Sequence, residues 1–185
     1  MNKIILGFVG PIASGKGTVC QYLKEKRKAN IYRFSTILRD ILNRIYVEQS
    51  RDNLQNLSLD LRKRFGDDIL ASTIAEDVGN DSSKIIAVDG VRRNPDIRYL
   101  KEMPNFYLVS INADQKTRYE RIIKRSENSD DTEKTFEKFQ QDEKEEAEQQ
   151  IAEVAKTAKF KIDNNGSIDK LHEQIEDILK KINES

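Results

Sequence analysis

The chain has 185 residues, of which 37% are hydrophobic and 35% charged, and its formal net charge is zero. This length suits one domain with a real core, whereas the balanced charge argues against the strongly basic face that nucleic-acid binding needs. Because the chain has a single cysteine, no apolar run near the ~18 residues of a membrane span and no signal-peptide pattern, we expect a cytoplasmic protein without disulfides or membrane contact.

Apolar periodicity predicts strands that alternate with helices along the whole chain, which is typical of a three-layer α/β domain. The expected strands cover residues 4–9, 31–34, 85–88, 106–111 and 159–162. The expected helices begin near Lys16 and then cover about 36–47, 54–65, 67–78, 115–125, 133–158 and 168–182. The middle of the helix over 133–158 has no large apolar residue, so we expect it to project into solvent.

The first strand leads into GPIASGKGT, residues 10–18, which fits the phosphate-loop pattern G-x-x-x-x-G-K. Glycines at 10 and 15 let backbone amides converge on phosphate oxygens, and the following helix presents its positive dipole end to the same anion. A glycine-rich turn with a solvated lysine is the alternative interpretation. The predicted nucleotide-binding residues are Gly10, Pro11, Ala13, Ser14, Gly15, Lys16, Gly17 and Thr18.

Gly17 occupies the position at which a serine or threonine usually ligates magnesium, and the hydroxyl comes one residue later at Thr18. A GKGT ending with a proline near the start of the loop resembles adenylate kinase and related nucleoside-monophosphate kinases. The resemblance implies a single α/β domain, residues 1–185, with a five-stranded parallel sheet in the order 2-3-1-4-5 and a short lid. It also implies ATP and Mg²⁺ as cofactors, with the ion held mainly by phosphates, waters, Thr18 and a second carboxylate.

The segment after the second strand, FSTILRD at 34–40, resembles the STGDLLRD segment of adenylate kinases without its Gly-Asp step. The resemblance places Arg39 on the phosphate of an acceptor and Ser35 or Thr36 beside its base or sugar. It also implies acceptor-binding helices over about 35–80. A solvated helix face is the alternative for Arg39, because surface arginines are common.

The third strand ends in IIAVDGVRR, residues 85–93. Parallel sheets place ligand-facing groups at the carboxyl ends of their strands, so we expect Asp89 to orient magnesium or its waters. A turn carboxylate is the alternative. Arg92 and Arg93 follow, and guanidinium groups match phosphate oxygens. The segment resembles DGFPR of adenylate kinase, whose arginine binds the acceptor phosphate, and either arginine can take that role here.

Three arginines, Arg118, Arg121 and Arg125, share one face of the helix expected over 115–125. A polar gap follows, and residues 126–150 hold ten Asp and Glu against three Lys. This arrangement resembles the lid of the same kinases, which implies a lid over about 121–145 whose Arg125 and Arg121 close over the triphosphate. A solvated basic face is the alternative.

The last strand is followed by Asn-Asn-Gly at 164–166. In the kinases that the chain resembles, this loop packs against adenine, which implies backbone contacts from Asn165 and Gly166. As residue types they are ordinary turn formers. We expect Cys20 in the core as an inert thiol and His172 on the surface with no role.

Together the motifs favour a phosphotransferase that moves the γ-phosphoryl group of ATP to a small phosphorylated acceptor, with a (deoxy)nucleoside monophosphate as the favoured substrate. The compact acceptor region and the VDG-V-R strand end also resemble dephospho-CoA kinase and deoxynucleoside-monophosphate kinases, so dephospho-CoA stays an alternative acceptor. A nucleotide-binding switch or slow ATPase with a protein partner is the alternative from another class, and it predicts hydrolysis indifferent to added monophosphates. The predicted catalytic residues are Lys16, Arg92, Arg93, Arg121 and Arg125.

Overall fold

The computed structural model describes residues 3–125, 135–143 and 146–184. In this part of the chain a five-stranded sheet has the order β2-β3-β1-β4-β5, and each neighbouring pair is parallel. The predicted α/β class and strand order are therefore confirmed. The strands are β1 (Ile4–Val9), β2 (Asn30–Arg33), β3 (Ile85–Val91), β4 (Phe106–Asn112) and β5 (Phe160–Asp163).

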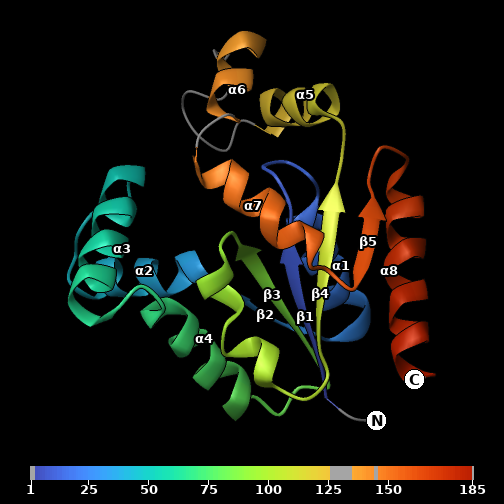
Figure 1. Ribbon diagram of the computed structural model, residues 1–185, viewed down its shortest axis with the longest axis horizontal. Coiled ribbons are helices and arrows are strands. Elements are labelled where there is room, and N and C mark those ends of the chain that lie inside the picture. The colour runs from blue at the N-terminus through green and yellow to red at the C-terminus, as the bar shows by residue number, and fades with distance from the viewer. Residues whose placement is uncertain (1–2, 126–134, 144–145, 185) are drawn as a thin grey trace.

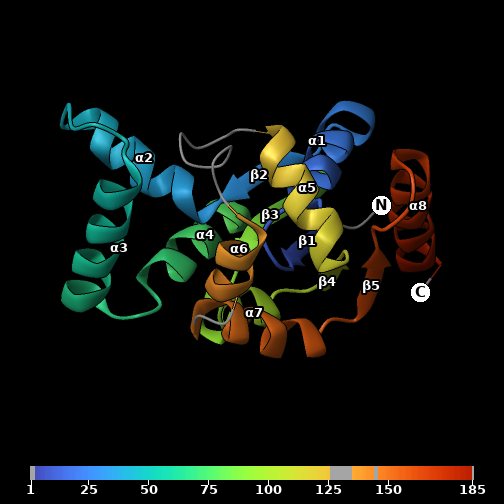
Figure 2. The same cartoon turned by 90° about the horizontal axis from the view of Figure 1, so that it is seen from above.

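Helices cover both faces of the sheet (Figures 1 and 2), with α1 and α8 on one side and α4 and α7 on the other. The helices α2 and α3 extend away from the sheet beyond β2, and α5 and α6 lie above the carboxyl ends of the strands. In the part of the chain that the structure describes, no helix combines the length and the apolar character of a membrane-spanning segment. The helices are α1 (Lys16–Arg27), α2 (Phe34–Arg44), α3 (Arg51–Phe65), α4 (Ile69–Asn80), α5 (Gln115–Arg125), α6 (Phe136–Asp142), α7 (Glu146–Lys156) and α8 (Ile168–Asn183), with short 3-10 helices η1 (Asn94–Ile97) and η2 (Leu100–Glu102).

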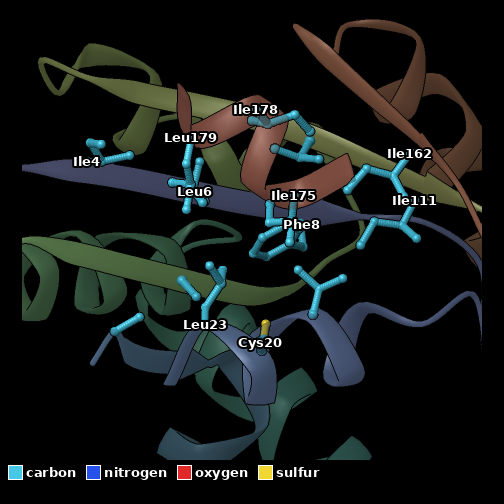
Figure 3. Packing of buried hydrophobic residues seen from close by; sticks show 14 of the residues in the cluster. Ile4, Leu6, Phe8, Cys20, Leu23, Ile111, Ile162, Ile175, Ile178 and Leu179 are labelled. Atoms are coloured by element: carbon cyan, nitrogen blue, oxygen red, sulfur yellow. The ribbon is translucent and has the colours of Figure 1, made fainter. Parts of the chain in front are cut away.

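The central strand β1 is buried along its whole length and divides the core. Because side chains alternate along a strand, Leu6 and Phe8 face α1 and α8, whereas Ile5 and Val9 face the helices on the other side. Figure 3 shows side chains of α1 and α8 converging on Leu6 and Phe8. Cys20 of α1 is fully buried in this cluster, as predicted, and burial together with the Asp89 charge raises the pKa of its thiol well above the usual range.

Several expected boundaries differ from the observed ones by up to three residues, and two differences change an element. Phe34 begins α2 instead of ending β2, because the pairing of β2 with β3 stops at Arg33 and Asp89. The helix expected over 133–158 is divided into α6 and α7 within the described residues. Their apolar faces have different partners, since Phe139 of α6 lies against Tyr119 of α5 and Ile151 of α7 packs with residues of the sheet.

Candidate active site

The candidate site lies at the edge of the sheet where the parallel strands end. Val9 of β1 pairs with Val91 of β3, so Gly10 and Arg92 leave neighbouring strands side by side. A bulge precedes this point, because Phe8 pairs with Asp89 and Gly90 is the extra residue, at φ 89°. The phosphate loop and the arginine pair therefore start about 4.8 Å apart, the usual strand spacing.

The loop between β1 and α1 wraps closely against β4. At Gly10, where φ is 157°, a Cβ atom would lie 2.1 Å from the carbonyl oxygen of Ile111. Ala13 and Gly15 also have positive φ, at 57° and 107°. In the described chain, no side chain caps the N-terminus of α1 and its first turn has no acidic residue. Its first N–H groups therefore have no capping side chain among the described residues and are available to an anion bound in the loop.

Lys16 contacts the backbone of the phosphate loop. Its Nζ atom donates hydrogen bonds to the carbonyl oxygens of Gly10, at 2.7 Å, and Pro11, at 2.8 Å. These contacts hold the ammonium group beside the loop amides, where the β- and γ-phosphates of a nucleotide would lie.

Ser14 has an unsatisfied hydroxyl group that favours a bound anion. Ser14 is fully buried, and its Oγ atom has no hydrogen-bond partner among the described residues. A buried hydroxyl without a partner costs about 1–3 kcal/mol. A phosphate oxygen in the loop would supply the missing acceptor, so the loop fits the nucleotide that its sequence predicts.

Asn164, directly after β5, braces the loop. Its Nδ2 atom donates to the carbonyl oxygen of Ser14 at 2.8 Å, and the residue is 5% exposed. The neighbouring Asn165 and Gly166, which the resemblance assigns to adenine, are exposed; Asn165 caps the turn by accepting from the backbone N–H of Asp114 at 2.7 Å. Sequence reasoning missed Asn164, although its place at the carboxyl end of a strand was a usable signal.

We expect Asn164→Ala to lower the free energy of unfolding by about 1–3 kcal/mol, because it leaves the buried Ser14 carbonyl without its donor. Nucleotide affinity should fall as well, since the loop loses a brace. Denaturant unfolding and nucleotide titration measure the two effects. Asn183→Ala is the matched control: it also removes one amide-to-carbonyl bond, to Leu179, but from an exposed residue. Equal destabilisation by the two variants would contradict the bracing role.

The arginines of α5 have different surroundings. Arg118 is only 6% exposed; it forms an ion pair with Glu143, donates from Nε to the Ala113 carbonyl at 2.9 Å and lies over the Phe139 ring. It thus ties α5 to the loop after β4 and to α6. The alternative of a solvated face is wrong for Arg118, and the expected projection into solvent is wrong for Glu143.

Arg121 contacts the phosphate loop and also Asn164, the residue that braces it. Its guanidinium donates to the carbonyl oxygens of Asn164, at 2.8 Å, and Ala13, at 3.5 Å. This position is consistent with the predicted role over the triphosphate. The side chain of Arg125 and residues 126–134 and 144–145 of the expected lid lie outside the described residues, so those predictions stay predictions.

Asp89 is 8% exposed and forms an ion pair with Arg33, whose Nε atom lies 2.9 Å from Oδ2. Another nitrogen of Arg33 lies 3.5 Å from where a Cβ on Gly17 would be, so this guanidinium stands beside the start of α1. Sequence reasoning missed Arg33, which ends β2 and pairs in register with Asp89. In the described residues no group of three metal-ligating side chains gathers, and Thr18 is exposed. The oxygen atoms of Asp89 and Thr18 are of the kind that Mg²⁺ binds, and the magnesium site stays a prediction.

The expected acceptor side has a buried carboxylate at its centre. Asp96 of η1 accepts hydrogen bonds through Oδ2 from the backbone N–H groups of Arg92 and Arg93, both at 3.0 Å. The Arg93 side chain is half-buried against it, whereas Arg92 is exposed. Burial raises the pKa of the Asp96 carboxyl, although these N–H groups and the two arginine charges oppose the rise.

The remaining predicted acceptor residues lie on α2. Arg39 is exposed and donates to the side chain of Gln49 at 3.2 Å. Ser35 and Thr36 are exposed in the first turn of the same helix. These contacts do not join the three residues to Arg93, so their acceptor roles stay predictions.

Comparison with known proteins finds similarity in sequence and in fold. A family model described as an AAA domain matches residues 9–140. A UPF0200 protein of Hyperthermus butylicus is 27% identical over 124 residues, which make up 67% of this chain and 66% of that protein. The chain therefore spans just under two thirds of the length of the curated relatives that it matches first.

Solved kinases share the fold. The shikimate kinase from Bacteroides thetaiotaomicron superposes with a TM-score of 0.58 at 10% identity, over 97% of this chain and 98% of that one. A gluconokinase from Sinorhizobium meliloti superposes with a TM-score of 0.56 at 12% identity, over 98% and 92% of the two chains. At these identities the likeness shows the α/β fold of phosphate-loop kinases and nothing about substrates.

Proposed function

We propose that this chain, which belongs to the AAA domain family and has arginines beside its phosphate loop, is an ATP-dependent phosphotransferase. Its substrate would be a small phosphorylated acceptor, and a (deoxy)nucleoside monophosphate is the favoured one. The family supports nucleotide binding by the loop. The transfer step and the acceptor are our proposal.

One observation carries the proposal. The loop that would hold the donor and the segment that would hold the acceptor leave paired residues, Val9 and Val91, of adjacent strands. Two anions bound in front of these ends would meet across a single strand spacing. Positioning of this kind supplies much of the catalysis in phosphoryl transfer, which needs no covalent intermediate.

The proposed roles follow from this arrangement. The loop amides and Lys16 would hold the β- and γ-phosphates, and Arg121 and Arg125 would cover the transferring group from a lid over about 121–145. Arg92 or Arg93, with Arg39, would fix the acceptor phosphate, and the helices over about 35–80 would form the acceptor side of a single domain.

Asp89 and Thr18 are the proposed residues toward magnesium. When bound, the ion would neutralise charge on the transferring phosphoryl group. Asp89 would supply a carboxylate oxygen and Thr18 a hydroxyl, and the ion pair of Asp89 with Arg33 uses the Oδ2 atom of Asp89.

The test is release of ADP from ATP in the presence of magnesium, measured with ribo- and deoxynucleoside monophosphates, dephospho-CoA, shikimate and gluconate. We expect one nucleoside monophosphate to raise ADP release well above the rate without acceptor, and a phosphorylated product to accumulate in equal amount. Stimulation by dephospho-CoA alone would support the alternative acceptor. Slow hydrolysis that is indifferent to every acceptor would overturn the kinase and favour the switch or ATPase.

A further inference from the structure

Two arginines from different parts of the chain converge on the buried Asp96. Arg62 of α3 has its Nη2 atom 3.7 Å from Oδ1 of Asp96, and Arg93 has its Nη2 atom 3.6 Å from the same oxygen. The Asp96 side chain is 5% exposed, the Arg62 side chain 13% and the Arg93 side chain 30%. This arginine–aspartate cluster, made of Arg62, Arg93 and Asp96, joins the acceptor-side helices to the end of β3.

The cluster has unused hydrogen-bonding capacity. Both Asp96 Oδ1 and Arg93 Nη2 are buried without a hydrogen bond to any described residue. Their separations from each other and from Arg62 are too long for hydrogen bonds, so neither ion pair is closed. Arg93 Nη2 is therefore a buried donor that lacks an acceptor, whereas Asp96 Oδ1 is an acceptor whose neighbours are the two guanidinium groups.

The charges show which partner fits. Two guanidinium groups face one carboxylate, so the cluster keeps one positive charge, and Arg92 beside it adds an exposed second one. A guanidinium has five N–H donors. The described hydrogen bonds of Arg62 use two of them, on Ser58 and on the carbonyl of Asp67. An oxyanion at the solvent-facing edge of the pair would accept from donors of both arginines.

We propose that Arg62 and Arg93 together bind the phosphate of the acceptor, with Asp96 as the positioning residue that holds the two guanidinium groups. This inference rests on the proposed function and deepens it, because it adds Arg62 to the acceptor site and selects Arg93 over Arg92. Asp96 accepts from two backbone N–H groups through Oδ2, which fixes the carboxylate. Its Oδ1 atom would lie between the two guanidinium groups on the side away from the acceptor phosphate. There it would keep the two groups at a fixed separation.

The arrangement also couples the position of the end of α3 to the binding of the acceptor. Arg62 lies near the end of α3, one turn before Gly66, whose N–H group donates to the Arg62 carbonyl at 2.9 Å. A phosphate shared by Arg62 and Arg93 would draw this end of the helix toward β3. Because two guanidinium groups would bind the phosphate, the site would prefer acceptors with a phosphate over the same molecules without one.

The experiment compares Arg62→Gln with Arg64→Gln, which removes the same charge from an exposed residue of the same helix. Steady-state kinetics are measured with the best monophosphate acceptor, and calorimetry follows binding of that monophosphate and of its nucleoside in the presence of ADP and magnesium. We expect Arg62→Gln to raise the acceptor KM and the monophosphate Kd roughly 10- to 100-fold, as for loss of a charge-assisted bond. The KM for ATP and the nucleoside Kd should stay as in the parent chain.

Further variants separate positioning from structural support. Arg62→Lys keeps the charge without the fork, so it should restore part of the lost acceptor affinity. Asp96→Asn keeps an oxygen for the two backbone N–H groups but loses the charge, and it should raise the acceptor KM without changing the KM for ATP. Thermal unfolding of each variant shows whether it is folded at the assay temperature.

The outcomes distinguish this inference from the proposed function. Normal turnover with unchanged acceptor KM in Arg62→Gln would overturn the inference and leave the kinase intact. Monophosphate binding without turnover in the parent chain would overturn the kinase, and a loss of that binding in Arg62→Gln would still support the site. A parent chain that binds no monophosphate, or variants that only lower the unfolding temperature, would overturn the arginine–aspartate cluster as a phosphate site.

Discussion

Lys16→Ala is expected to lower the rate of phosphoryl transfer by on the order of 10²- to 10³-fold, as for loss of one preorganised charge or donor at a transition state. The Nζ atom already lies within hydrogen-bond distance of two loop carbonyls, those of Gly10 and Pro11. When a triphosphate occupies the loop, the same ammonium group would reach the β- and γ-phosphates and follow the charge that develops between them. The measurement is kcat and kcat/KM for ADP release with the acceptor saturating.

The control for this variant is Lys24→Ala, which removes an exposed lysine from the same helix. We expect it to keep normal turnover, and we expect the free energy of unfolding of Lys16→Ala to change by only about 1 kcal/mol, because its bonds to loop carbonyls are ordinary ones. An unchanged kcat in Lys16→Ala would contradict the assignment of the loop as the donor site.

The strands and the loop were predictable because their signals are local. A continuous apolar run such as 85–88 indicates a strand covered on both faces, and the glycine spacing of 10–18 depends only on neighbouring residues. The order of the strands came from the resemblance, since parallel strands pair through crossovers whose partners no local pattern specifies. The two short helices between β3 and β4 had no periodic signal, because a 3-10 turn is too short to show one.

The side-chain partners in the site could not be predicted from the sequence, for a physical reason. Arg33 meets Asp89 only because β2 and β3 pair in that register, and a slip of one residue would turn Arg33 to the opposite face. Asn164 reaches Ser14 across 150 positions of the chain. Sequence reasoning therefore found groups that act through local geometry, such as Lys16, and missed those that act by holding distant elements together.

Arg62 illustrates the same limit. In the sequence it is one of several charged residues in the last turns of α3, and nothing in its spacing separates it from Arg64. The structure separates them, because Arg62 is directed at Asp96 and Arg64 is exposed. The exposed fraction and the unfilled hydrogen bonds of its neighbours, both properties of the folded chain, are what single it out.

Gly10→Ala should have the largest effect on both folding and binding. Its Cβ would lie 2.1 Å from the carbonyl oxygen of Ile111 and 2.9 Å from the Oγ atom of Ser14. The first of these is backbone in β4, which is held between β1 and β5 and cannot move aside without breaking strand pairs. We expect the free energy of unfolding to fall by about 3 kcal/mol, near the upper end for overpacking. Nucleotide binding should be lost, because the loop would have to leave its contact with β4.

Gly79→Ala is the matched control for this variant. Gly79 lies near the end of α4, is exposed, and a Cβ there would meet no atom within 4 Å. Since alanine favours the helix over glycine, this variant should be more stable than the parent chain by about 0.5–1 kcal/mol, with unchanged nucleotide affinity. If the close approach at Gly10 shapes the loop, denaturant unfolding gives stability changes of opposite sign for the two variants, and nucleotide titration shows a loss of affinity for Gly10→Ala but not for Gly79→Ala. If Gly10→Ala instead matched Gly79→Ala in both measurements, the loop would not depend on its contact with β4.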